Sequence, residues 1–159
     1  MITNNKYILA SSSLSRYKIL KNCGFKFKKY SPKCDEEKVK SRIKNKNIKA
    51  STLAKKLAFE KARSISIEKK HLDKFVIGCD TLIYLDNKIL DKAKNLKEAK
   101  SKLNFLSGRE HKIISGLSVC KGGKLLWQCS ETTTVVIRKL NNKNISEYLK
   151  KTGKQIFNS

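Results

Sequence analysis

Blocks of apolar residues separated by polar turns predict alternating strands and helices in the first part of the chain. A short apolar run predicts a strand over Lys6–Ala10, and the serines of Ser11–Ser13 form the turn that follows it. We predict a helix over Ser15–Asn22, because Gly24 stands where a left-handed C-terminal cap is wanted. Phenylalanine and lysine alternate over Phe25–Tyr30, which is typical of a half-buried strand. This order of elements is that of an α/β domain.

The middle of the chain predicts the longest helix and the most buried strand. Ser31 starts a polar loop that contains the acidic run Asp35–Glu37. Apolar residues then recur at helical spacing from about residue 49 to residue 67, with Lys61 one step off the apolar face. Phe75–Leu85 is nearly continuous in apolar side chains, as expected of a central strand buried on both faces.

The last third predicts two helices around a β-hairpin. A helix is expected over Asn95–Leu106, with its first residue as the N-cap. Two strand-like runs, His111–Cys120 and Lys124–Arg138, are joined by Gly122-Gly123, a pair that accepts the positive φ angles of a tight turn. A final helix is predicted over Asn144–Lys151. The whole pattern predicts a mixed α/β fold.

The composition and the net charge of the chain suggest nucleic acid as a class of partner. The formal net charge is +24, and clustered cationic residues gain affinity for a polyanion by releasing its counterions. The excess is almost all lysine and comes with abundant Asn and Ile, so a coding bias toward A and T could produce it without a partner, and a functional basic face is the other interpretation. Aromatic residues stand at core-like positions and are not interleaved with basic ones as single-strand platforms require. We therefore do not expect a nucleic-acid partner, and a basic nucleic-acid-binding module without catalysis stays the alternative.

Length and cysteine content bound the class further. The 159 residues support one core, so we expect a single domain over residues 1–159. No apolar run approaches the roughly 20 residues of a membrane span, and we expect no membrane partner. The five cysteines are odd in number and form no C-x-x-C pair, which favours a reduced, cytoplasmic protein.

The serine turn and the helix after it offer an anion site. Ser11, Ser12 and Ser13 stand before a helix N-terminus, where hydroxyl and main-chain N–H groups point to one place. N-capping alone would also explain these serines. Arg16 in the next turn is mildly unfavourable beside the positive end of the helix dipole unless an anion binds there. Arg16 therefore favours a phosphate site.

Asp80 interrupts an otherwise apolar strand. A buried carboxylate must be paired, metal-bound or exposed at a strand end, and a structural pair with one of the many lysines is one interpretation. The other is phosphate chemistry, which needs hard oxygen ligands for Mg²⁺, lysines for developing charge and a base for water. The residues that would supply these are Glu36, Asp80, Lys61 and Lys92. His71 and His111 lack any ligand spacing and receive no role.

Six motifs of the chain resemble, in the same order, those of the Maf family of nucleoside triphosphate pyrophosphatases. The opening motif L-A-S-x-S-P-R-R is similar to Leu9–Arg16, and the central motif G-[AS]-D-[TQ] is similar to Gly78–Thr81. The motifs V-D-E, L-A-x-x-K-A, G-K-P and L-S-G-R resemble residues 34–36, 57–62, 91–93 and 106–109. The matches span nearly the whole chain.

The resemblance implies a long twisted mixed sheet flanked by helices, of the Maf and ITPase-like kind, with the substrate in a cleft. It implies hydrolysis of a nucleoside triphosphate between the α and β phosphates with Mg²⁺ or Mn²⁺, and it allows a homodimer. Asp80 would be the general base and a metal ligand, Glu36 would hold the metal, and Lys61 and Lys92 would neutralise the triphosphate. The residues implied to bind the substrate are Ser11, Ser13, Ser15, Arg16 and Thr81.

Two motif positions point to different substrates within this family. Ser15 stands where the branch acting on dTTP and UTP has arginine, which favours a non-canonical nucleotide of the 7-methyl-GTP type. Thr81 favours dTTP or UTP, because the 7-methyl-GTP branch often has glutamine there. Leu14 and Ala93 replace family prolines. Both substrate branches therefore stay open.

The end of the chain is the largest departure from the family pattern. Family members continue past the helix equivalent to Ile145–Lys151 into a segment that completes the cleft and part of the sheet, so we expect a truncated chain with reduced activity. An inactive relative that serves as a dimerising scaffold is a further interpretation.

Overall fold

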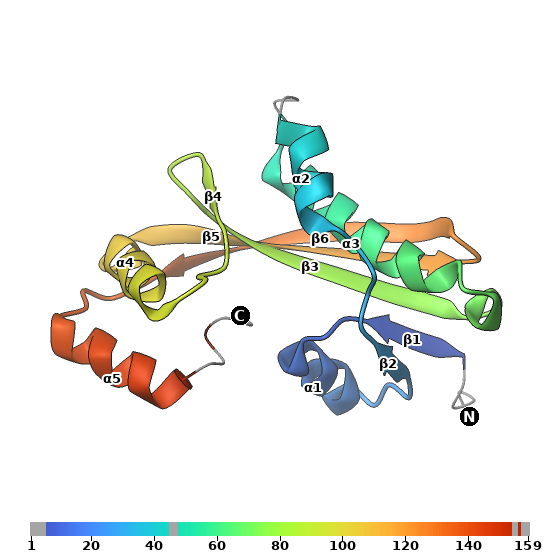
Figure 1. The fold of residues 1–159 in the computed structure, drawn as a ribbon, viewed down its shortest axis with the longest axis horizontal. Helices are drawn as coiled ribbons and strands as arrows, with labels where there is room; N and C mark the ends of the chain where they lie inside the picture. Colours follow the sequence, from blue (N-terminus) through green and yellow to red (C-terminus); the bar gives the residue numbers. More distant parts are fainter. Residues whose placement is uncertain (1–5, 45–47, 154–155, 157–159) are drawn as a thin grey trace. The chain divides into compact units, whose positions relative to one another are not determined.

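The computed structural model describes residues 6–44, 48–153 and 156 (Figure 1). The chain divides into two compact units. The first unit comprises the chain up to Thr81 together with Ile114–Thr132, and the second comprises Leu82–Ile113 and the chain from Thr133 onward. The expectation of a single domain over residues 1–159 stays a prediction. One mixed sheet has the strand order β2-β1-β3-β5-β6, with β4 paired to β3. The strands are β1 (Tyr7–Ala10), β2 (Lys28–Tyr30), β3 (Phe75–Leu85), β4 (Lys88–Leu90), β5 (Glu110–Lys121) and β6 (Lys124–Val136).

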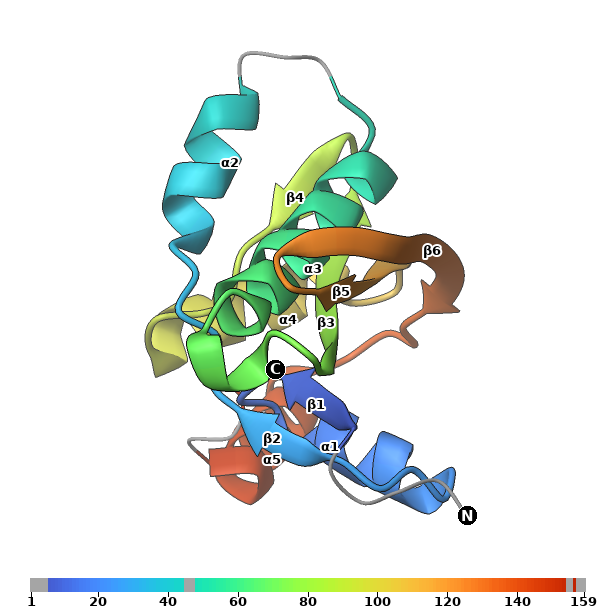
Figure 2. The same ribbon diagram turned by 90° about the vertical axis from the view of Figure 1, so that its right-hand side faces the viewer.

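In the first unit, the chain leaves β1 and reaches its two neighbouring strands through different helices. Strand β1 pairs in parallel with β2 and with β3, in the register that places Ala10 opposite both Tyr30 and Gly78. Helix α1 (Leu14–Asn22) leads to β2, whereas α2 (Glu36–Lys44) and α3 (Ala50–Ser66) lead to β3. Helices α1 and α3 lie on opposite faces of these strands (Figures 1 and 2). The carboxyl end of β1 is therefore a topological switch point, where open α/β sheets bind ligands.

Two glycines bring α3 directly onto the sheet. A Cβ atom on Gly78 of β3 would lie 2.1 Å from the carbonyl oxygen of Ala58, and one on Gly116 of β5 would lie 2.4 Å from that of Ala54. Only a residue without a side chain permits such close contact between helix and strand. The buried cluster at this contact comprises Ile8, Ala10, Ala62, Ile65, Val76 and Cys120. Packing against β1 and β3 thus fixes which side chains of α3 point at the sheet.

The second unit is built from the β3–β4 hairpin and two helices. Asp86 and Asn87 form the hairpin turn with φ angles of 49° and 59°, a conformation that these residue types tolerate. Helices α4 (Leu96–Leu106) and α5 (Asn142–Thr152) are linked through Ser107, whose hydroxyl accepts a hydrogen bond of 2.7 Å from the Leu140 main-chain N–H. Arg109 forms an ion pair with Asp86.

Most predicted elements are confirmed, including the full extent of β3 and the Gly122-Gly123 hairpin turn. The predicted strand over Phe25–Tyr30 is too long, because only its last three residues pair with β1. The predicted polar loop at Glu36 and Glu37 is wrong, because both residues lie in the first turn of α2. The Asp35 carboxylate accepts a hydrogen bond from the Lys38 main-chain N–H at 2.9 Å and caps this helix.

Three further points differ from the sequence expectations. Strand β3 is buried alternately rather than evenly on both faces, so Val76, Gly78 and Asp80 share its more buried face. The short strand β4 and the 3₁₀ turn η1 (Lys69–His71) were not predicted.

Within the described ranges, no helix combines the length and apolar character needed to cross a membrane.

Candidate active site

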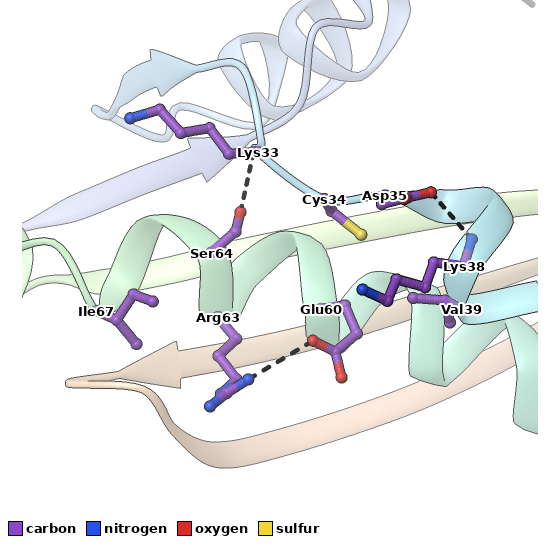
Figure 3. Close-up of a pocket in the computed structure, with 9 residues that line it drawn as sticks. All are labelled: Lys33, Cys34, Asp35, Lys38, Val39, Glu60, Arg63, Ser64 and Ile67. Atoms are coloured by element: carbon purple, nitrogen blue, oxygen red, sulfur yellow. Dashed lines mark hydrogen bonds and ion pairs between the residues drawn. The ribbon is translucent and has the colours of Figure 1, made fainter. Parts of the chain in front are cut away.

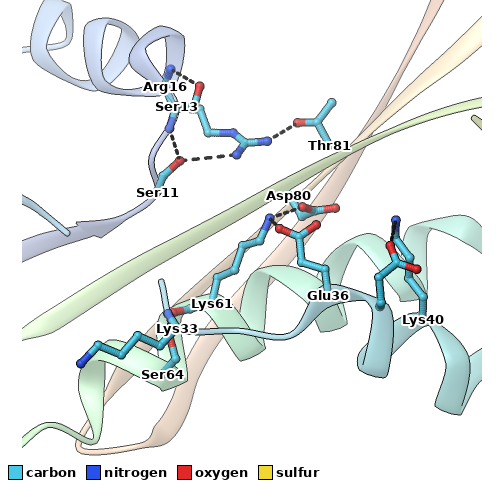
Figure 4. Close-up of polar contacts among 11 residues, drawn as sticks. Ser11, Ser13, Arg16, Lys33, Glu36, Lys40, Lys61, Ser64, Asp80 and Thr81 are labelled. Atoms are coloured by element: carbon cyan, nitrogen blue, oxygen red, sulfur yellow. Dashed lines mark hydrogen bonds and ion pairs between the residues drawn. The ribbon is translucent and has the colours of Figure 1, made fainter. Parts of the chain in front are cut away.

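A buried lysine joins two carboxylates on the α3 face of the sheet. Lys61 of α3 places its Nζ 2.5 Å from Oδ1 of Asp80 on β3 and 2.9 Å from Oε1 of Glu36 in the first turn of α2 (Figure 4). Lys61 and Asp80 are 6% and 5% exposed, whereas Glu36 is partly open to solvent. Three separate elements therefore present their charged groups to one point.

The burial of Lys61 corrects the sequence expectation that it lies off the apolar face of its helix. Lys61 is four residues after Leu57 and three after Ala58, so it belongs to the stripe that faces the sheet. A charged group at such a position costs free energy unless it is paired. Asp80, the aspartate in the apolar strand, is the partner that makes this burial tolerable.

Burial and charge act in opposite directions on this pair. Burial raises the pKa of the Asp80 carboxyl above its ordinary value, although the charge of Lys61 and its hydrogen bond oppose this. Burial opposes the charge on Lys61, but the attraction of Asp80 and the hydrogen bonds to Asp80 and Glu36 outweigh it and raise the pKa of Lys61. The lysine is therefore held as an ammonium between two acids.

A second polar group surrounds the guanidinium of Arg16. Ser13 caps α1 and accepts a hydrogen bond from the Arg16 main-chain N–H at 3.4 Å. The Arg16 side chain donates to Oγ of the buried Ser11 at 3.5 Å and to Oγ1 of Thr81 at 3.1 Å. The Thr81 hydroxyl lies 3.3 Å from that of Ser115 on β5. The guanidinium thus stands at a helix N-terminus, where an anion would be favoured.

The two groups use consecutive residues of β3 near the switch point, one group on each face of the strand. Asp80 and Thr81 are consecutive, so their side chains point to opposite sides of the strand. Strand β1 ends at Ala10, opposite Gly78, so the following residues of β3 run past its end. The Arg16 guanidinium donates to Thr81, the residue next to Asp80, and its charge opposes the rise that burial causes in the pKa of Asp80. Arg16 therefore reaches the residue next to Asp80, and the roles of both residues stay predictions.

Two predicted site residues lie at exposed positions of the chain. Ser15 is exposed on α1, and Lys92 is exposed after β4 in the second unit. Their roles stay predictions. Ser115 joins the Arg16 group and was not identified from the sequence, because only the pairing of β3 with β5 places it beside Thr81.

The chain also has a hollow of about 270 Å³ between the segment before α2 and the C-terminal half of α3 (Figure 3). Its rim includes Lys33, whose main-chain N–H donates to Oγ of Ser64 at 3.2 Å, and the ion pair of Arg63 with Glu60 at 3.8 Å. Neither Lys61 nor Asp80 lines it. The hollow is therefore distinct from the lysine and its two carboxylates.

The carboxylates around Lys61 are the groups that would have to hold the metal ion expected from the sequence. In the described part of the chain, no group of three or more His, Cys, Asp and Glu side chains is arranged to hold a metal ion. The carboxylates of Glu36 and Asp80 are nevertheless hard oxygen donors, and Mg²⁺ in nucleotide sites is commonly held by one or two carboxylates plus substrate phosphates. The residues present fit Mg²⁺ in that form.

The serine and arginine group and the lysine-bridged carboxylate pair lie near the switch point of an α/β sheet, where their donors and charges suit an anionic ligand. A family model described as Maf-like protein matches residues 6–157. The chain belongs to the Maf family.

Relatives from bacteria are similar over most of the chain. A nucleoside triphosphate pyrophosphatase of Legionella pneumophila strain Paris is 32% identical over 142 residues, which are 89% of this chain and 69% of that protein. A 7-methyl-GTP pyrophosphatase of Rhizobium johnstonii is 30% identical over 154 residues, 97% of this chain and 76% of that protein. Among solved structures, a dITP/XTP pyrophosphatase of Mycobacterium abscessus gives a TM-score of 0.44 at 16% identity, covering 85% of this chain and 75% of that one.

Proposed function

We propose that the chain is a nucleoside triphosphate pyrophosphatase, a hydrolase that releases a nucleoside monophosphate and pyrophosphate. Water attacks the α-phosphorus, its new bond to oxygen forms, and the bond from that phosphorus to the α–β bridging oxygen breaks. Pyrophosphate leaves with the electron pair of that bond. The proposal is supported by membership of the Maf family and by the names of the relatives.

The observation that carries the proposal is that Arg16 binds Thr81, the residue next to Asp80, just past the carboxyl end of β1. Arg16 and the N-terminus of α1 supply the positive charge and N–H donors that a triphosphate needs. Asp80 supplies a carboxylate on a rigid central strand. This arrangement supports a phosphate chain and a base for water at one switch point.

Each buried charge has a distinct part in the proposed reaction. Asp80 accepts the proton of the attacking water, and its raised pKa brings it closer to the neutral range in which a general base is effective. Lys61 orients Asp80 and Glu36 through its two ion pairs and offsets negative charge on the phosphates. Ser11 and Thr81 hold the Arg16 guanidinium in place.

The divalent ion belongs to this proposal as well. Glu36 and Asp80 would hold Mg²⁺ or Mn²⁺ together with the substrate phosphates. When bound, the ion would supply positive charge that stabilises the phosphates during bond cleavage.

The proposed substrate is a non-canonical nucleotide of the 7-methylguanosine type. Ser15 at the family position of an arginine supports it, and so does the name of the Rhizobium relative. The second candidate is dTTP or UTP, which Thr81 favours. In the structure Thr81 accepts a hydrogen bond from Arg16, so its hydroxyl belongs with the residues that we propose to bind the phosphates.

A substrate panel tests the proposal. Pyrophosphate release is measured for 7-methyl-GTP, GTP, dTTP and UTP, each with Mg²⁺, with Mn²⁺ and with a chelator. We expect release from 7-methyl-GTP to exceed that from GTP by at least tenfold and to stop with the chelator. Preference for dTTP or UTP would replace the first substrate by the second, and release of phosphate alone would refute the pyrophosphatase mechanism.

A further inference from the structure

A second hollow lies over the β1–β2 pair, and nothing in the proposed reaction uses it. It has a volume of about 280 Å³ and is lined by Lys28 of β2 and by Lys70 and Lys74 of the segment that precedes β3. Its walls include Ile8 of β1, which belongs to the core cluster beneath α3. Figure 2 shows β2 beside β1. We name this feature the β2 hollow.

The cationic side chains of the β2 hollow exceed the acidic groups that pair with them. Lys70 lies 3.5 Å from Glu68, and Lys74 lies 2.7 Å from Asp73. Lys28 has no ion-pair partner within the described residues, and Glu68 is shared with Lys33 at 3.2 Å. Lysines crowded at one place in a chain of net charge +24 repel one another, so an anion bound among them would be stabilising.

Aromatic and imidazole groups form the rest of the β2 hollow. Tyr7 and Tyr30 line it, and the Tyr30 ring lies 4.7 Å from the ring of His71 at 59°. Lys70 Nζ lies 5.6 Å from the centre of the Tyr30 ring. His71 is only 4% exposed, and its Nδ1 has no hydrogen-bond partner among the described residues, although a Glu68 oxygen lies 3.5 Å away. Buried polar atoms are nearly always hydrogen-bonded, and His71 lines the hollow, so a ligand bound there would supply the partner that its Nδ1 lacks.

We infer that the β2 hollow is a second binding site, for a nucleoside monophosphate. Lysines without full acidic pairing suit a phosphate, and tyrosine rings suit a flat base. The volume of the β2 hollow is near the lower end of the range for small-molecule sites, which is about 300 Å³. A single nucleotide would fill the hollow, whereas a longer nucleic-acid strand would be too large for it. Lys28, Lys70 and Lys74 hold the phosphate, and Tyr7 and Tyr30 contact the base.

The test follows GMP binding by NMR in the full chain. We expect the amide signals of Lys28 and of residues 69–74 to shift on addition of GMP. The Lys28→Ala/Lys70→Ala variant should bind at this site at least tenfold more weakly. The matched variant Lys56→Ala/Lys112→Ala, which removes two exposed lysines elsewhere, should bind GMP within twofold of the parent.

An active-site variant separates this inference from the proposed function. Arg16→Ala should lose nucleotide hydrolysis and still show the shifts of Lys28 and residues 69–74. GMP shifts confined to residues 11–16 and 79–81 would overturn the second site. So would an equal loss in both double-lysine variants, or binding of a ten-nucleotide RNA at the same residues with an affinity far above that of GMP and a steep dependence on salt.

Discussion

Lys61 Nζ lies 2.5 Å from Asp80 Oδ1, and the side chains of both residues are 7% exposed. The pair joins the longest helix to the central strand at the point where β1 ends. Lys61 and Asp80 are 19 residues apart in the sequence. Helix α3 packs closely on β3 at Gly78. Stability and proposed chemistry therefore depend on the same ion pair.

Replacing Lys61 by Met should leave the carboxylate of Asp80 buried without its cation. We expect a loss of about 3 kcal/mol in the free energy of unfolding, because breaking one side of a buried pair leaves an uncompensated charge. Urea unfolding at neutral pH measures it. Lys56→Met, an exposed change on the same helix, is the control and should shift stability by less than about 0.5 kcal/mol. Equal losses in the two variants would contradict the assignment.

Ser115 should act on the substrate through Thr81 and Arg16. Removing its hydroxyl with Ser115→Ala takes away the partner 3.3 Å from Thr81, so we expect KM for the preferred nucleotide to rise about two- to tenfold, the value of one hydrogen bond. The kcat should change little, because Asp80 is untouched. Steady-state kinetics separates the two constants.

The variant Ser115→Thr retains a hydroxyl at this position and should restore KM to near the parent value. A fall in kcat with unchanged KM in Ser115→Ala, or a failure of Ser115→Thr to recover, would exclude a positioning role for this residue.

The Cys120 thiol should be the least reactive of the five cysteines. Burial raises its pKa from about 9.0 to about 11, whereas Cys23 is exposed on the surface. Between these two pH values the unfolded thiol ionises while the folded one stays protonated, so stability should fall as pH rises from about 9 to about 11. Alkylation at pH 8 followed by mass spectrometry should label Cys23 first and Cys120 last.

The Cys120→Ala variant should lose the part of the pH dependence that comes from this thiol. Rapid labelling of Cys120 in the native protein would contradict the packing of β5 beneath α3.

The sequence predicts the elements of this fold well where local pattern decides them. Apolar spacing locates α3, and the apolar run of β3 is recovered at both ends. Helix α2 was missed because its positions are mostly charged, although Asp35 followed by two acids is an N-terminal signal. The strand β2 is shorter than its alternating pattern suggests, because β1, its pairing partner, has only four residues.

The candidate site is predictable from the sequence only where a residue is unusual for its local surroundings. Arg16 beside a serine cap and Asp80 in an apolar strand are unfavourable locally, and both prove to have partners. The burial of Lys61 and the contact of Ser115 with Thr81 depend on how α3 and β5 lie against β3. Those contacts join residues far apart in sequence, so periodicity alone does not give them.

The most direct test of the central claim is pyrophosphate release by the parent chain and by Asp80→Asn, assayed with the preferred nucleotide and Mg²⁺. Asparagine keeps the shape of the side chain but cannot accept the proton of water, so we predict a 10²- to 10⁴-fold loss of kcat with a folded protein by circular dichroism. Asp86→Asn in the second unit is the matched control and should keep kcat within about twofold. An Asp80→Asn protein that is folded and releases pyrophosphate at the parent rate would contradict the account.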